Sequence, residues 1–280
     1  MDSVQYQLEM SPERIIRGTI ELPGQEHWPA PVVIFCHGFK GFKDWGGWPW
    51  FTRSLAERGF VVNRLNFSLA GVGESLDCHD EPEKFARNTF GAELDDLHFL
   101  LKRVDAWGVP SGALGSGLGL VGHSRGGMVS LLFAAEEPRV DTAVTLAAPG
   151  HSDRFPPDQK QLWRQQGYLE MLNARTGQVL RMDVSILDDY EAHRDRYDVE
   201  RALSKRSVPT LVIHGEEDES VGINEASFIY GALQIEAKEL VKIPDTGHTF
   251  GTVHPFAGPT PAVEEGLHRT ARWLQEHLPR

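Results

Sequence analysis

The stretch Leu118-Gly-Leu-Val-Gly-His-Ser-Arg-Gly-Gly127 places a serine between an apolar run and the start of a second apolar segment. Glycines stand two positions before and two positions after Ser124, at Gly122 and Gly126. They leave room for a very tight strand-to-helix turn, which lifts a serine hydroxyl out of a sheet. The helix that follows directs the positive end of its dipole at that hydroxyl. The pattern favours a nucleophilic serine over the alternative, a serine in an ordinary glycine-rich turn.

Short apolar runs alternate with amphipathic stretches along the rest of the chain. This alternation is typical of a mainly parallel sheet with helices on both faces, an α/β fold. Strands are expected, about eight in all, at residues 4–10, 14–22, 31–36, 60–65, 118–122, 140–147, 209–213 and 237–243. The first two alternate in polarity and are predicted to form an antiparallel pair. Helices are expected at residues 50–58, 85–107, 128–137, 221–233 and 262–278. Residues 1–280 are therefore predicted to form a single domain.

Residues 151–206, after the sixth predicted strand, interrupt this alternation of apolar runs and amphipathic stretches. Of these 56 residues (206 − 151 + 1), 20 are charged, ten of each sign, which is denser than the 24% of the whole chain. Such a density predicts a solvated, helical insertion. Its aromatic residues are able to pack it onto the domain: Phe155, Trp163, Tyr168, Tyr190 and Tyr197. The insertion either covers one edge of the domain or forms a small cap that shapes the substrate site.

The charge of the chain excludes some classes of protein. The 280 residues include 28 Lys and Arg against 40 Asp and Glu, a formal net charge of −12. A nucleic-acid binder needs a basic face, so no nucleic-acid partner is expected. For the same reason, docking on an anionic membrane is not expected. The first ten residues lack the basic and apolar regions of a secretory signal, and no apolar run approaches the ~20 residues of a membrane span. Cys36 and Cys78 form no Cys-x-x-Cys pair, so we expect a soluble, reduced, cytoplasmic protein.

Acyl transfer needs two N–H donors that converge on the carbonyl oxygen of the substrate. One is expected from the residue after the nucleophile, Arg125. The second is expected from the loop after the strand at residues 31–36, where the sequence reads His37-Gly38-Phe39. Phe39 is the predicted second donor, and Gly38 lets the loop turn closely. Without Ser124 nearby, the same residues would merely end a strand.

A serine hydroxyl also needs a base, and the chain has 12 histidines. His248 follows the last predicted strand, so it lies at the same edge of the sheet as Ser124. His254 is in the same loop region and is the second choice. His268 and His277 fall on the closing helix, where they are expected to face solvent.

The acid that orients this base is expected after another strand, between Ser124 and His248 in the chain. Asp218, in His214-Gly-Glu-Glu-Asp218-Glu-Ser-Val221, fits this place. Glu217 and Asp153 are rivals, and Asp218 could instead cap the following helix. The chain order of serine, acid and histidine is that of an α/β-hydrolase.

The motifs HGF at 37–39, GHSRGG at 122–127, HGEEDESV at 214–221 and GHTF at 247–250 together resemble the α/β-hydrolase superfamily over nearly the whole chain. A glycine-rich loop at 66–75 extends this resemblance. More narrowly, the chain resembles the cinnamoyl/feruloyl-esterase-like and dienelactone-hydrolase-like serine hydrolases of bacteria. Dienelactone hydrolases proper use a cysteine where this chain has Ser124. The insertion at 151–206 lies where cinnamoyl esterases carry a small cap.

This resemblance implies a carboxylic-ester hydrolase that works through an acyl-enzyme on small or medium soluble esters, aromatic ones among them. Ser124 would attack, His248 would take the proton, Asp218 would hold the imidazole, and no cofactor or metal would be needed. A hydrolase of amides, peptides or thioesters with the same triad is the alternative. A catalytically inactive receptor with this fold is disfavoured by the complete triad. Oligomeric state is not predicted.

The loop Asp44-Trp-Gly-Gly-Trp-Pro-Trp-Phe51 is unusually aromatic. One interpretation places Trp45 and Trp48 on the wall of a substrate pocket suited to flat or apolar groups. The other interpretation is that these rings pack the following helix onto the core. His123, beside the nucleophile, is assigned to the same substrate wall or to the hydrogen bonds that hold the loops of the site.

Overall fold

An eight-stranded sheet forms the centre of the computed structural model, which describes residues 2–75, 78–173 and 177–279. The strand order is β1-β2-β4-β3-β5-β6-β9-β10, and only β2 runs antiparallel to its neighbours. The bounds are β1 Ser3–Ser11, β2 Arg14–Glu21, β3 Ala30–Cys36, β4 Val61–Asn66, β5 Leu114–His123, β6 Thr142–Leu146, β9 Thr210–Gly215 and β10 Lys238–Ile243. The predicted sheet, with its antiparallel start, is confirmed.

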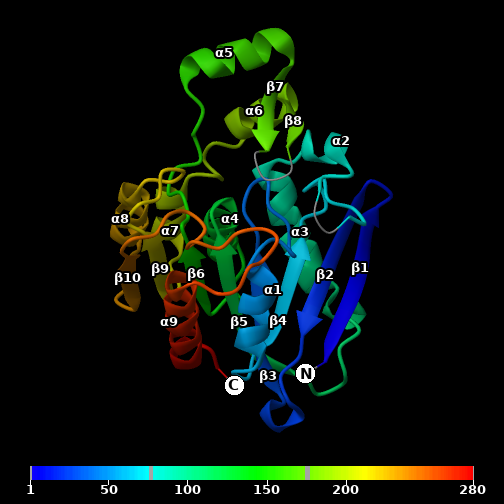
Figure 1. The fold of residues 1–280 in the computed structure, drawn as a ribbon, viewed down its shortest axis with the longest axis vertical. Helices are drawn as coiled ribbons and strands as arrows, with labels where there is room; N and C mark the ends of the chain where they lie inside the picture. The colour runs from blue at the N-terminus through cyan, green and yellow to red at the C-terminus, as the bar shows by residue number, and fades with distance from the viewer. Residues whose placement is uncertain (1, 76–77, 174–176, 280) are drawn as a thin grey trace.

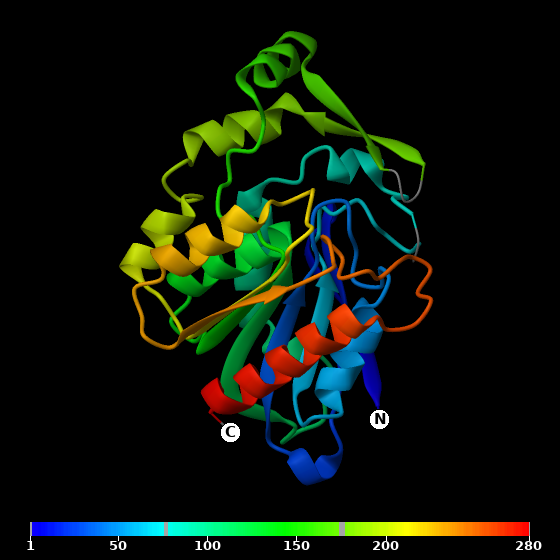
Figure 2. The ribbon, with the colours of Figure 1, turned by 60° about the vertical axis from the view of Figure 1, so that its left-hand side comes forward.

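Helices cover both faces of this sheet (Figures 1 and 2). One face carries α1 (Trp48–Ala56) and α9 (Pro261–His277), and the other carries α3 (Phe90–Lys102), α4 (Arg125–Glu136), α7 (Val199–Lys205) and α8 (Ile223–Ala232). Between them the central strands are buried on both faces, as in β3, where all seven residues are buried. β-Branched residues suit such a strand, and Pro31-Val-Val-Ile34 supplies three of them. None of the helices in the described ranges is long and apolar enough to cross a bilayer.

The long helix expected at residues 85–107 is divided into three pieces. The pieces are α2 (Pro82–Phe85), which ends where the expected helix begins, α3, and the 3-10 turn η2 (Val104–Ala106). A separate 3-10 turn, η1 (Gln25–His27), precedes β3. The Thr89 hydroxyl accepts a hydrogen bond from the Ala92 amide at 3.0 Å. This side-chain cap starts a new helix at Phe90, because it satisfies an amide that a continuous helix would bond to its own backbone.

The insertion between β6 and β9 contains a β-hairpin that the helical expectation did not include. It holds α5 (Pro157–Gln166), β7 (Tyr168–Asn173), β8 (Gln178–Asp183) and α6 (Val184–Ala192), followed by α7. The hairpin buries alternate residues, Leu169 on β7 and Leu180 and Met182 on β8. Residues 174–176 lie outside the described residues.

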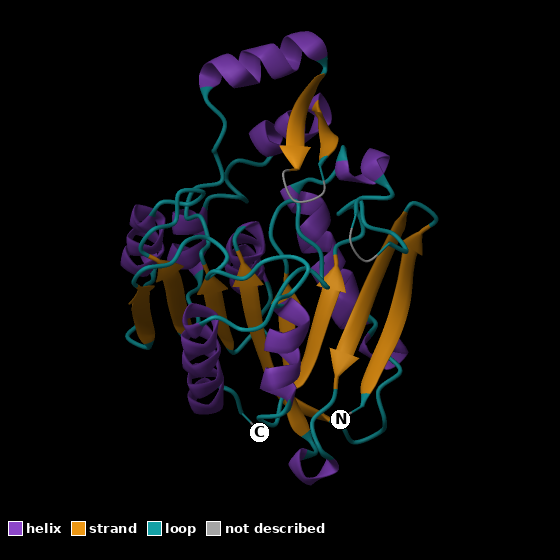
Figure 3. Ribbon diagram, viewed as in Figure 1, coloured by secondary structure: helices purple, strands orange, loops and turns teal. Residues whose placement is uncertain are grey.

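The four elements α5, β7, β8 and α6 stand above one end of the sheet (Figure 3). The segment 151–198 that contains them is called the cap below, and the sheet with its covering helices is called the platform. Helix α7 belongs to the platform, because it packs on α4 and α8. The cap therefore extends over the edge of the sheet at which Ser124 lies.

Candidate active site

Ser124 occupies a strained turn between β5 and α4. Its backbone angles are φ 53° and ψ −126°, in a region that side-chain-bearing residues rarely adopt. A Cβ on Gly122 would lie 2.3 Å from the Gly126 carbonyl oxygen, and a Cβ on Gly126 would lie 2.4 Å from the carbonyl oxygens of Cys36 and His37. Both glycines are thus required by backbone close approach, which is the physical basis of the motif.

Three side chains from three loops meet at this turn. The His248 Nε2 atom lies 2.9 Å from the Ser124 Oγ, and the His248 Nδ1 atom lies 2.7 Å from the Asp218 Oδ2. Ser124 follows β5, Asp218 follows β9 and His248 follows β10, all at the carboxyl ends of parallel strands. The structure thus brings together the serine, acid and histidine that the sequence singled out.

The two oxygens of Asp218 have separate partners. Oδ1 accepts hydrogen bonds from the amides of Ser220 at 2.9 Å and Val221 at 2.8 Å, while Oδ2 faces His248. The His214 Nε2 atom lies 3.3 Å from Oδ2 as well. Burial would raise the pKa of Asp218, but the hydrogen bonds from His214, His248 and the Val221 amide outweigh it and hold the pKa far below its usual value. The acid is therefore an ionised carboxylate that both shapes its loop and orients the imidazole.

The rival residues lie elsewhere. His254 accepts a hydrogen bond from the Gly46 amide at 3.0 Å through its Nδ1 atom, and its ring stacks on Trp45. Glu217 is exposed, and Asp153 forms an ion pair with Lys160. The structure thus places His254, Glu217 and Asp153 in contacts other than the chain of hydrogen bonds to Ser124.

The two predicted oxyanion donors belong to loops that flank the serine. Arg125 is the first residue of α4, so its amide is among those that have no acceptor within the helix. Phe39 follows Gly38, at which a Cβ would lie 2.9 Å from the Ser124 Cβ. No backbone acceptor takes the Phe39 amide in the described part of the chain. Both amides are therefore available beside the Ser124 hydroxyl.

The Arg125 side chain points away from the reaction and into the platform. Its Nε atom donates to Glu93 Oε2 at 3.0 Å, and its Nη2 atom donates to the Asn88 carbonyl oxygen at 3.1 Å. Glu93 is only 3% exposed, and its burial raises its pKa against the opposing effect of Arg125. The guanidinium also lies over the Phe90 ring, 4.3 Å from the centroid. Arg125 thus offers its amide to the site while its charge is neutralised elsewhere.

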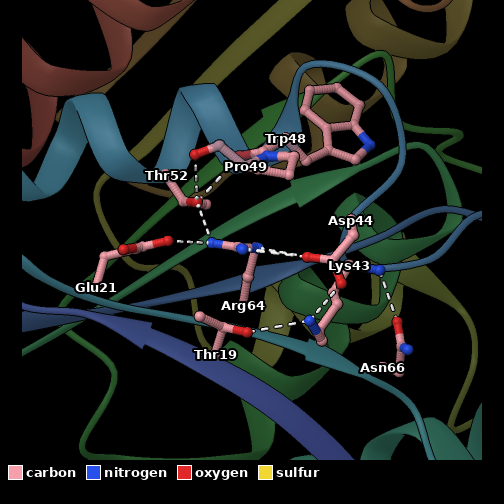
Figure 4. Close-up of polar contacts among 9 residues, drawn as sticks. All are labelled: Thr19, Glu21, Lys43, Asp44, Trp48, Pro49, Thr52, Arg64 and Asn66. Atoms are coloured by element: carbon pink, nitrogen blue, oxygen red, sulfur yellow. Dashed lines mark hydrogen bonds and ion pairs between the residues drawn. The ribbon is translucent and has the colours of Figure 1, made fainter. Parts of the chain in front are cut away.

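Buried charges hold the loop that carries Phe39 (Figure 4). Arg64 on β4 donates to Asp44 Oδ1 from Nε at 3.2 Å and from Nη2 at 3.1 Å, and it also pairs with Glu21. Lys43 pairs with Asp44 and donates to the Thr19 hydroxyl at 3.0 Å. Two cations and two carboxylates are therefore matched inside the platform, and they fix the loop after β3 to β2 and β4.

A cavity of about 450 Å³ opens above Ser124 and His248, between platform and cap. Its walls include eight aromatic and methionine side chains: Phe39, Phe90, Met128, Phe155, Trp163, Met171, Met182 and Tyr190. Five of these eight residues come from the cap. The size and lining are typical of a site for a small or medium organic ligand.

Trp45 and Trp48 are not part of this cavity, so their assignment to the pocket wall is corrected. They are 4% and 1% exposed and pack in the core between the sheet, α1 and α9. The Trp48 ring lies 5.1 Å from the Phe35 ring on β3. Flanking aromatic residues look alike in sequence whether they face a ligand or a core, and here the rings attach α1 to the sheet.

His123 is not on the cavity wall either. It is 4% exposed, and its Nε2 atom lies 2.9 Å from the His248 carbonyl oxygen. It therefore connects the strand that precedes Ser124 with the loop that carries His248, which agrees with the second of the two interpretations above.

The cap residues of the wall are not predicted from the sequence as substrate contacts. Phe155, Trp163 and Tyr190 are expected only to pack the insertion onto the domain, and Met171 and Met182 have no predicted role. The alternation of apolar residues in Tyr168–Asn173 and Gln178–Asp183 was the signal that could have revealed the hairpin. Which of its faces meets the cavity depends on where the cap docks, and no motif encodes that.

Comparison with known proteins supports the fold family that these motifs predict. A family model described as the alpha/beta hydrolase family matches residues 33–258. Est1E from Butyrivibrio proteoclasticus, solved with ferulic acid, is similar with a TM-score of 0.72 and 19% identity over 94% of this chain and 96% of that chain. No curated protein matches the sequence.

Two further solved structures are similar over their full length. Dienelactone hydrolase from Anabaena variabilis has a TM-score of 0.64 and 18% identity, covering 100% of both chains. The esterase domain of a Rhodothermus marinus protein has a TM-score of 0.65 and 18% identity over 99% of both chains. The expected resemblance to feruloyl-esterase-like and dienelactone-hydrolase-like proteins is confirmed, and at these identities it is a likeness of fold. With the family match spanning 226 of 280 residues (258 − 33 + 1), the chain belongs to the alpha/beta hydrolase family.

Proposed function

We propose that this protein is a serine hydrolase that cleaves small to medium carboxylic esters through an acyl-enzyme. The observation that carries the proposal is the continuous chain of hydrogen bonds from Asp218 through His248 to Ser124, which ends in a cavity of about 450 Å³. A hydroxyl in contact with a correctly held imidazole is an activated nucleophile.

Each step follows from these contacts. The Ser124 Oγ attacks the acyl carbon while the His248 Nε2 takes the hydroxyl proton, and Asp218 stabilises the imidazolium through Nδ1–H. The amides of Phe39 and Arg125 bind the oxyanion of the tetrahedral intermediate. The intermediate collapses as the alcohol leaves with the proton from His248. A water molecule then loses a proton to His248, attacks the acyl-enzyme, and releases the acid and Ser124.

The lining of the cavity favours esters with an aromatic or extended apolar group. Phe39, Phe155 and Tyr190, all partly exposed, offer ring faces and edges, and Met171 adapts to irregular shapes. Est1E, which is similar in fold, was solved with ferulic acid, an aromatic carboxylic acid. We therefore propose that aromatic acyl esters are among the substrates. A cytoplasmic location stays a prediction from the sequence.

The test is labelling with a fluorophosphonate probe, combined with a panel of matched esters, thioesters and amides. The wild type should be labelled and should hydrolyse esters fastest. Ser124→Ala should lose labelling and most turnover, while the control Ser152→Ala, at another serine on the cavity wall, should retain both. Equal labelling of Ser124→Ala and wild type would exclude Ser124 as nucleophile. Faster turnover of amides or thioesters would instead reassign the substrate class.

A further inference from the structure

The cavity differs in charge from the protein that contains it. The chain carries a formal net charge of −12. Among the residues that the structure describes, the cavity wall, in contrast, includes four basic residues, Lys40, Arg125, Arg154 and Lys160, and a single acidic one, Asp153. Because opposite charges attract, this local reversal bears on which ligand the site accepts.

Two of the four cations are already neutralised by protein carboxylates. The Arg125 guanidinium is bonded to the buried Glu93 at 3.0 Å, so its charge is balanced behind the wall. Lys160, at the start of the cap, forms an ion pair with Asp153. The acidic residue of the wall is thereby also accounted for.

Arg154 is different, because its hydrogen bond goes to a group without net charge. Its Nη2 atom donates to the Ser220 carbonyl oxygen at 2.6 Å. Within the described ranges, none of the ion pairs joins Arg154 to a carboxylate. A guanidinium has five N–H donors in a planar fork that matches a carboxylate, and one bond to a carbonyl leaves most of that fork unused.

The same hydrogen bond fixes where this charge lies. Ser220 is part of the loop that holds the catalytic acid, since its amide donates to Asp218 Oδ1 at 2.9 Å. Ser220, Val221 and Arg154 line one cavity together with Ser124 and His248. Arg154 is exposed, and its guanidinium is attached to the platform at one point on the wall of the cavity that also contains the reacting atoms.

We infer that Arg154 forms an anion subsite, and that the preferred substrate is an ester whose apolar body ends in a carboxylate. The inference rests on the proposed ester hydrolysis and names its substrate class. The reacting ester lies at Ser124, the apolar body lies against the aromatic and methionine wall, and the carboxylate pairs with the Arg154 fork. A neutral ester of equal length still reacts but lacks this last contact.

The experiment compares two series of p-nitrophenyl esters. One series has acyl chains that end in a carboxylate, from succinate to suberate, and the other has unsubstituted acyl chains of equal length. A third arm uses acetyl esters of phenols with and without a carboxylate, to place the anion on the alcohol side. For at least one arm and length, the wild type should show the higher kcat/KM for the carboxylate-bearing ester.

Arg154→Gln should lower kcat/KM for that ester by about 10- to 100-fold and leave the neutral ester within about threefold, as expected for the loss of a charge-assisted hydrogen bond. Arg154→Lys, which keeps the charge without the fork, should recover part of the loss. The matched control is Arg164→Gln in α5, which makes the same charge change at an arginine paired with Asp188 and Glu191 outside this cavity. It should leave both esters unchanged.

Two results would overturn the subsite. The first is a wild type without preference for the carboxylate at any length in any arm. The second is an equal loss on charged and neutral esters in Arg154→Gln, which would mean that Arg154 acts through Ser220 on the Asp218 loop. Both results leave ester hydrolysis itself intact, because that is judged from the neutral esters and from Ser124→Ala.

Discussion

The platform and the cap use the same kinds of side chain in opposite ways. In the platform, Arg64 and Glu21 are 6% and 3% exposed and form a matched buried pair. In the cap, Arg181 and Glu170 pair across the hairpin with side chains 58% and 48% exposed. The chemistry of the site is thus held by contacts that tolerate little change, while one wall of its cavity belongs to a segment with a solvated exterior.

The two regions nevertheless share one apolar cluster. Trp163 and Leu180 of the cap pack in a cluster with Phe85 of α2, and the Phe39 ring lies 5.2 Å from Phe85. Phe39, the proposed oxyanion donor, is therefore also in contact with the cluster that the cap contributes to. At the cavity the platform and the cap form one surface, so they differ in how each is stabilised and not in whether they meet the ligand. Four substitutions, in order of decreasing effect, test this comparison of platform and cap.

Asp218→Asn should lower kcat/KM by about 10⁴-fold, because the amide cannot hold His248 in the tautomer that accepts the Ser124 proton. The fold should survive, since the asparagine oxygen can still accept the amides of Ser220 and Val221. Steady-state kinetics on a neutral ester measures the effect. Asp188→Asn, at an exposed acid of the cap, is the control and should keep full activity. A variant at 218 with more than about a tenth of wild-type activity would contradict the assigned role.

Arg64→Met should lower the free energy of unfolding by about 3–5 kcal/mol, because it leaves the Glu21 carboxylate buried without its partner. Arg181→Met in the cap should cost less than about 1 kcal/mol, since its partner stays solvated. Urea unfolding of both variants measures the difference directly. Equal losses would mean that burial does not separate the ion pairs of the two regions.

His79 lies where cap and platform meet, so its protonation tests their junction. Its backbone exchanges two hydrogen bonds of 2.9 Å with the side chain of Gln178. Burial lowers its pKa to about 4; Asp80 opposes this shift and Lys40 adds to it. The unfolded chain therefore binds more protons between about pH 4 and 6.5, and the free energy of unfolding should fall as the pH falls through that window.

His79→Gln should flatten this dependence, by at most about 3 kcal/mol at the acid end. His37, whose pKa burial also lowers to about 4, keeps a residual slope in the variant. Urea unfolding across the window is the measurement, with His268→Gln at an exposed position of α9 as the control. An unchanged slope in His79→Gln would show that the junction does not contribute to acid sensitivity.

Phe155→Ala should produce the smallest effect, a change of about 2- to 10-fold in the kcat/KM ratio of aromatic to aliphatic esters. Phe155 lines the cavity and packs edge-on against Trp163. Trp48→Phe, at the buried first residue of α1, should leave this ratio unchanged even if it lowers stability. If this ratio changed in Trp48→Phe and not in Phe155→Ala, the result would indicate that the substrate contacts the aromatic segment after β3 and not the cap.

The sequence predicted the parts of the molecule that steric necessity dictates. A Cβ on Gly122 would collide with the Gly126 carbonyl oxygen four residues on, and a Cβ on Gly126 would collide with the end of β3 at Cys36 and His37. Both collisions are with backbone, so they require glycine whatever the neighbouring side chains are, and a short motif reveals the turn at Ser124. Strand ends then bring His248 and Asp218 to the same edge, because parallel strands share a direction.

The rest depends on docking between distant segments. Trp48 had two consistent interpretations, and only its packing against Phe35 distinguishes them. The Thr89 cap starts α3 at Phe90, whereas apolar spacing alone extends the helix back to Phe85. The cavity wall depends on the position of the cap, which follows from contacts such as the hydrogen bond from the Asp183 amide to the Ala86 carbonyl oxygen at 2.8 Å. Such contacts join residues that are far apart in the sequence, so no short sequence motif marks them.

Arg125 has two roles, one through its amide and one through its side chain, and a substitution affects them unequally. An amide is common to every residue except proline, so ordinary substitution at 125 leaves the proposed oxyanion donor in place. The guanidinium, in contrast, is what balances the Glu93 carboxylate beneath the site. Proline suits the first turn of a helix, yet it restricts the residue before it to extended backbone, which the φ of 53° at Ser124 violates. Most substitutions at position 125 would therefore leave the Glu93 carboxylate unbalanced beneath the active site and would still keep the amide donor.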